Sequence, residues 1–257
     1  MLQYIKKKDT QGGKIVSVKF VVGSKFWNPE VNDVYTSIDT FRTIIENHPY
    51  AVDNIYVPGQ GLSESERQDV IDTVRVPAIK KYFLNNGKLL NSDKTHKCND
   101  YNILISELST ITHGKYRSCL YLHQDNELLL DHFDGSHIPG MVLLEATRQL
   151  AIATWSQFEQ RDTSGMAMVI NDIHCHFHDF AFPFCINIDI SIDRVEKDNN
   201  YRLNVEFIQN GNMFSNSYGT FRVIENKKLR KLERIYSKKI LNNHKRYLEQ
   251  DLEETVA

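Results

Sequence analysis

The sequence predicts an α+β protein in which one long buried helix packs against antiparallel strands, preceded by a small α/β unit. The helix is expected from Pro139 to about Trp155, where good helix formers are apolar nearly all the way round. A helix without a polar face has to be wrapped by other structure. Strand-like runs flank it at residues 102–108, 116–122, 167–180, 186–195 and 201–223, separated by turn signals. We therefore expect three parts, at residues 1–90, 91–225 and 226–257.

The amino-terminal part has an α/β pattern. We expect strands at residues 14–23 and 54–57, and a helix at residues 40–47 that is capped by Ser37 or Asp39 and stopped by His48-Pro49. This alternation of strand and helix is typical of a small α/β unit.

A second helix is expected to begin at Ser63, because Ser63 and Glu66 have the spacing of a capping box. The loop before it, Pro58-Gly59-Gln60-Gly61, lacks the third glycine and the Lys-Ser/Thr pair of the phosphate-binding fingerprints. We interpret it as a plain turn. The sequence assigns no role to this part of the chain.

The composition is that of an ordinary globular protein. The 257 residues are 41% hydrophobic and 25% charged, with a net charge of −2, which argues against affinity of the whole protein for nucleic acid or an anionic membrane. The four cysteines form no C-x-x-C pair, and no signal peptide or membrane-spanning run is evident. We expect reduced thiols and a cytoplasmic protein.

Three long polar side chains interrupt the apolar helix. Glu145, Arg148 and Gln149 are three and four positions apart, so they share one face. A carboxylate among apolar residues is expected to have a raised pKa, which suits a group that exchanges protons near neutral pH. The alternative is a structural ion pair between Glu145 and Arg148.

The run around this helix resembles a known family. It reads Asp131-His132, then His137-Ile138-Pro139-Gly140-Met141-Val142-Leu143-Leu144-Glu145-Ala146-Thr147-Arg148-Gln149. This run is similar to the second repeat of the A-factor biosynthesis (AfsA-type) hotdog family, and less closely to the hotdog dehydratases. The resemblance implies a hotdog fold, an antiparallel sheet wrapped around a long central helix.

The resemblance covers residues 96–223, about half of the chain, and it has two departures. Phe182 stands where the family has a glutamate. The family also has two hotdog repeats, and only one is clear here. Residues 14–90 are therefore a degenerate or replaced first repeat, or the protein pairs its hotdogs as a homodimer, which we favour because a lone hotdog leaves an open sheet edge.

The family resemblance implies an acyltransferase that moves a β-ketoacyl group from acyl carrier protein to a dihydroxyacetone-phosphate-like acceptor, as in γ-butyrolactone signal biosynthesis. Glu145 would accept the hydroxyl proton, and Arg148 would bind phosphate or steady the carboxylate. His132 is the candidate loop histidine. The residues expected to bind or orient the substrate are Gln149, His137, Gly140, Met141 and Asp131. No cofactor is implied.

Two other functions remain open. One is a hotdog dehydratase or thioesterase acting on acyl carrier protein or acyl-CoA. The other is a non-catalytic module that binds an acyl group or a signal molecule.

Two other patterns have plainer interpretations. His174, His176 and His178 alternate along a strand and share a face, but they are spaced along it, which disfavours a metal site. Residues 227–248 form a basic amphipathic pattern. We interpret it as a solvated helix that caps the domain; the alternative is a docking surface for an acidic partner such as acyl carrier protein.

Overall fold

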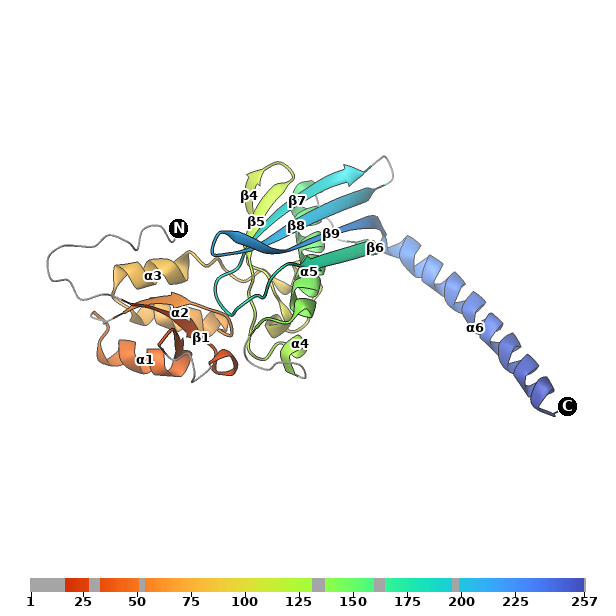
Figure 1. Cartoon of the computed structure of the whole chain (residues 1–257). Helices are drawn as coiled ribbons and strands as arrows, with labels where there is room; N and C mark the ends of the chain where they lie inside the picture. The colour runs from red at the N-terminus through yellow and green to blue at the C-terminus, as the bar shows by residue number, and fades with distance from the viewer. Residues whose placement is uncertain are drawn as a thin grey trace.

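The computed structural model describes residues 17–27, 33–50, 54–130, 137–159, 165–195 and 199–256, with side chains as far as residue 251. Figure 1 shows a small amino-terminal unit, a larger sheet-and-helix body, and a long helix that leaves the body at the carboxyl terminus. None of the described helices is long and apolar enough to cross a membrane.

The larger body is a hotdog. Its sheet has the order β4-β5-β7-β8-β9-β6, and every neighbouring pair is antiparallel. The strands are β4 (Ser109–Thr112), β5 (Lys115–Cys119), β6 (Met166–Phe177), β7 (Asn187–Val195), β8 (Asn200–Gln209) and β9 (Asn212–Glu225). The central helix is α5 (Gly140–Glu159). The predicted fold class is therefore confirmed.

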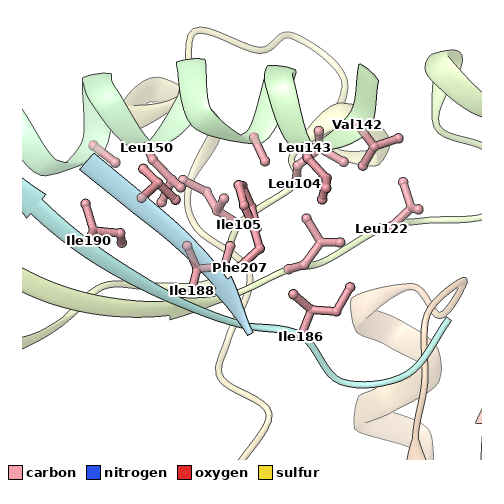
Figure 2. Packing of buried hydrophobic residues seen from close by; sticks show 14 of the residues in the cluster. Leu104, Ile105, Leu122, Val142, Leu143, Leu150, Ile186, Ile188, Ile190 and Phe207 are labelled. Carbon is pink, nitrogen blue, oxygen red and sulfur yellow. The ribbon is translucent and has the colours of Figure 1, made fainter. Parts of the chain in front are cut away.

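The hotdog core lies between the sheet and α5. Along β8, alternate residues are buried, namely Tyr201, Leu203, Val205 and Phe207, as expected for a strand with one covered face. In Figure 2 the α5 side chains Val142, Leu143 and Leu150 point toward Ile188 and Ile190 of β7 and Phe207 of β8. These side chains belong to one continuous core cluster.

One expected strand is wrong. We predicted a strand at residues 102–108, but the hairpin partner of β5 is β4, several residues later. The earlier segment contains a short 3-10 helix (Asp100–Asn102) and then single bridges, such as Ile105 with Leu120. The reason is tertiary: the Leu104 N–H donates to the side-chain amide of Gln149 of α5, and the Asn102 carbonyl accepts from the same amide, in place of strand partners.

The amino-terminal unit has a parallel sheet, β2-β1-β3, formed by β1 (Val18–Val22), β2 (Tyr35–Ser37) and β3 (Ile55–Pro58). Its helices are α1 (Ile38–Asn47), α2 (Glu64–Thr73) and α3 (Pro77–Leu84). Ser37 caps α1 by accepting from the Thr40 N–H, and the capping box of Ser63 and Glu66 is formed. A parallel sheet is not a hotdog, so this unit is not a degenerate first repeat in structure.

The Gly59-Gln60-Gly61 loop joins the two units, and it is a structural turn as the sequence indicated. Gln60 is buried, and its amide donates to the carbonyls of Leu120 and Phe184 at 3.2 and 3.0 Å and accepts from the Leu122 N–H at 2.8 Å. Gly61 has φ +91°, and a Cβ there would lie 2.7 Å from the Gly23 nitrogen. The loop therefore fastens the α/β unit to the hotdog.

The last helix, α6 (Asn226–Val256), differs from the expected cap. It touches β9 and β6 only near its start and then extends away from the body (Figure 1). A short helix, α4 (Glu127–Leu130), comes before α5 in the chain.

Candidate active site

The polar face of α5 is where the sequence predicted chemistry, and the structure brings its three residues together. Arg148 makes a bidentate pair with Glu145, in which Nε donates to Oε2 and Nη2 to Oε1, both at 2.8 Å. The Gln149 amide donates to Glu145 Oε1 at 3.1 Å. Side chains three and four residues apart on a helix can therefore interact, and these three do.

A fourth residue, Lys97, completes the cluster. Its Nζ lies 2.8 Å from Glu145 Oε1, and both side chains are about a quarter exposed or less, at 26% and 20%. The sequence assigned no role to Lys97, because its pairing with a helix residue 48 positions later depends on the fold.

The backbone just before Lys97 has an unusual conformation. His96 has φ 55°, a left-handed conformation that is uncommon for residues other than glycine. The preceding Thr95 is fully buried, and its carbonyl accepts from Arg148 Nη2 at 3.1 Å. Arg148 therefore holds both Glu145 and the segment that carries Lys97.

Gln149 links the same helix to the next part of this segment. It is fully buried, and its amide accepts from the Leu104 N–H at 2.9 Å and donates to the Asn102 carbonyl at 2.8 Å. The nitrogen of this amide also donates to Glu145, so both its oxygen and its nitrogen are hydrogen-bonded. This geometry suits a residue that orients the Glu145 carboxylate.

The pKa of Glu145 is shifted in the direction opposite to our expectation. Burial raises this pKa, but hydrogen bonds from Arg148, Lys97 and Gln149, with the charge of Arg148, outweigh burial and lower it from 4.5 to about 2. The expected rise is therefore wrong. The physical reason is that two cations and an amide serve a single carboxylate.

The other predicted residues are at the start of α5. Ile138 N–H donates to the Ala181 carbonyl at 2.7 Å, and the ring of His137 meets Phe180 edge-on at 5.1 Å. At Gly140, a Cβ would lie 2.8 Å from the ring of Phe177. Met141 is exposed.

Glu145 is five residues further along α5 than Gly140, about 7 Å along the axis. The contacts found for the start of the helix are with β6 and the loop after it. His132 and Asp131 lie outside the described residues.

His174 and His176 lie along β6, and His178 follows the end of that strand. His174 and His176 stack against Tyr218, with centroids at 4.7 and 5.8 Å, and His178 Nε2 is 2.7 Å from Asn216 Oδ1. Among the residues that the structure describes, no group of three His, Cys, Asp or Glu is placed to hold a metal ion.

The antiparallel sheet and its central helix, which carries this partly buried polar cluster, define a hotdog-fold protein. More particularly, residues 89–225 match the family model described as the A-factor biosynthesis hotdog domain, and the chain belongs to that family. No curated protein matches the chain.

Several solved structures are similar to part of the chain. A hot-dog-like protein from Thermanaerovibrio acidaminovorans is 15% identical, with a TM-score of 0.40, over 50% of this chain and 92% of that one. A mutant thioesterase from Pseudomonas aeruginosa is 8% identical, with a TM-score of 0.38, over 65% and 96%. The PaaI protein of Escherichia coli is 14% identical, with a TM-score of 0.35, over 46% and 78%.

Proposed function

We propose that this protein is an acyltransferase that moves a β-ketoacyl group from an acyl carrier protein thioester to a hydroxyl of a phosphorylated triose such as dihydroxyacetone phosphate. The observation that carries the proposal is the pairing of one carboxylate, Glu145, with two cations, Arg148 and Lys97. The cluster has a net charge of +1, which suits an anionic acceptor. Family membership supports the acyl-thioester part.

Glu145 needs activation before it can act as a base. With a pKa of about 2 it is ionised at neutral pH but takes up a proton poorly. A phosphate entering the cluster would compete for Arg148 and Lys97. Burial, which raises the pKa, would then dominate, so acceptor binding would itself prepare Glu145.

In the proposed reaction, the acceptor hydroxyl loses its proton to Glu145 while its oxygen attacks the thioester carbonyl. The tetrahedral intermediate then expels the carrier thiolate, which takes the proton and leaves as a thiol. The first N–H groups of α5, at Gly140 and Met141, have no acceptor within the helix and are suited to hold the developing oxyanion.

We also propose that the active form is a homodimer paired through β6. This strand is long and lies at the edge of the sheet. Near its end, Met141, Phe177, Phe180 and Phe182 are exposed apolar side chains. An exposed edge beside an apolar patch favours strand pairing with a second copy.

The test is mass spectrometry of the protein with β-ketoacyl carrier protein, with and without dihydroxyacetone phosphate. We expect an acyl triose-phosphate ester that is lost in Glu145→Gln and retained in Glu206→Gln, a control at an exposed site on β8. Free acid or an enoyl thioester would instead identify a thioesterase or dehydratase acting on acyl carrier protein or acyl-CoA.

One observation favours a second candidate, a non-catalytic acyl-binding module. A carboxylate locked by three donors also serves as a structural element that needs no turnover. Retention of intact thioester on the protein, equal for wild type and Glu145→Gln, would identify this function and refute the transferase.

A further inference from the structure

The helix α6 is uncovered over most of its length. Leu229 and Leu232, in its first two turns, are partly buried near the sheet, but every described side chain from residue 233 to residue 251 is exposed. Figure 1 shows the helix extending clear of the body. Most helical stability in proteins comes from docking an amphipathic face. No element that the structure describes covers α6 beyond its first turns.

Its exposed apolar residues gather on one side. At about 100° per residue, most of them fall within an arc of about 140°. They are Tyr236, Ile240, Leu241, Tyr247 and Leu248. Ile235 lies outside this apolar arc, and Arg230, Glu233, Ser237, His244 and Asp251 lie within it.

The rest of the circumference is cationic. Arg234, Lys238, Lys239, Lys245 and Arg246 occupy a second arc of similar width, opposite the first. Residues 226–248 contain nine lysines and arginines and one acidic residue, Glu233, for a net charge of +8. Glu249, Asp251, Glu253 and Glu254 lower the net charge of the whole helix to +4, in a chain whose total is −2. The net charge of the whole chain therefore does not reveal the positive charge of this segment.

We propose that α6 lies along the surface of an anionic phospholipid membrane. The apolar arc would enter the boundary between headgroups and acyl chains, which is the usual environment of such helices. Tyrosines at Tyr236 and Tyr247 suit this boundary because their rings are apolar and their hydroxyls polar. The cationic arc would add attraction to the negative surface.

A second copy of α6 fits this pattern less well. A coiled coil needs apolar residues at alternating steps of three and four. The heptad register that contains Leu232 and Tyr236 also places Lys239, Asn243 and Arg246 in the seam. The register that contains Tyr236, Ile240 and Tyr247 also places Glu233, Asn243 and Gln250 there. Both seams are interrupted by polar or charged groups.

An acidic protein partner also fits less well. A globular partner on the cationic arc leaves the opposite apolar arc in water. On a membrane, the apolar arc is buried while long lysine and arginine side chains at its borders reach the phosphates. A planar anionic surface can therefore bury the apolar arc and pair with the cationic side chains at the same time.

The experiment is co-sedimentation of the full-length protein with vesicles of phosphatidylcholine and phosphatidylserine, and with phosphatidylcholine alone. We expect binding to the anionic vesicles that weakens with salt. Ile240→Asp/Tyr247→Asp and Lys238→Glu/Lys245→Glu should each reduce it about tenfold or more. The control, Lys81→Glu/Lys88→Glu, changes the same charge at exposed sites away from α6 and should bind as wild type.

Circular dichroism would establish that all variants are folded. Absence of sedimentation with anionic vesicles would overturn the proposal, as would binding that both α6 variants retain. A molar mass that halves on Ile240→Asp/Tyr247→Asp without vesicles would identify a second copy as the occupant. Capture of an acidic carrier protein that requires Lys238 and Lys245, with no vesicle binding, would identify a protein partner.

Discussion

Replacing Glu145 by Gln tests the central ion cluster through stability as well as turnover. The carboxyl is only 20% exposed, and its pKa falls from 4.5 in the unfolded chain to about 2. A shift of this size corresponds to about 3 kcal/mol of stability at pH 7. Gln removes the charge but keeps the shape and an oxygen acceptor, so we expect Glu145→Gln to unfold with about 3 kcal/mol less free energy.

The sign of the pH dependence follows from the lowered pKa. A carboxylate of this kind stabilises the folded state above the unfolded pKa of 4.5, and the contribution is lost as pH falls toward 2. At pH 3 about 1 kcal/mol of it should remain. The difference between wild type and Glu145→Gln should therefore shrink by about 2 kcal/mol between pH 7 and pH 3.

The assay is urea unfolding of both proteins at several pH values, with Glu206→Gln as the matched control. Taking the difference between variant and wild type removes the titration of other carboxyl groups. A difference that stays constant from pH 7 to pH 3 would refute the argument, because the stabilisation would then not depend on ionised Glu145.

Four further predictions follow from individual contacts. Lys97→Met removes a hydrogen bond to Glu145, so the carboxyl pKa should rise above about 2 in an NMR titration; an unchanged titration would contradict the pairing. Arg148→Lys keeps the charge but loses the bidentate geometry and the bond to the Thr95 carbonyl, so KM for the phosphorylated acceptor should rise about tenfold, and an unaltered KM would argue against a phosphate role. Gln60→Ala leaves three buried backbone groups unpaired and should lower the unfolding free energy by about 2–4 kcal/mol in urea; a loss under about 1 kcal/mol would indicate that water replaces the amide. Gly61→Ala places a Cβ 2.7 Å from a backbone nitrogen at φ +91° and should lower the melting temperature by several degrees, about 2 kcal/mol or more, and an unchanged melting temperature would mean that the loop adapts.

Local sequence signals predicted much of the fold because they depend on neighbouring residues. The apolar run after Pro139 indicated α5, and its burial follows from the absence of a polar face. The capping box at Ser63 was also readable, since it needs only a few consecutive residues. The strand predicted at residues 102–108 failed because Gln149, far along the chain, takes the backbone hydrogen bonds that a strand would use.

The sequence by itself determined which side chains of α5 are chemically unusual, because helical spacing alone places Glu145, Arg148 and Gln149 on one face. Only the tertiary structure decided the charge state of Glu145. Burial and ion pairing shift its pKa in opposite directions, and the outcome depends on distances to Lys97 and Arg148 that no local pattern contains. The same holds for α6. Its pattern predicted an amphipathic helix, but only the tertiary structure shows that it contacts β6 and β9 near its start and then leaves the hotdog.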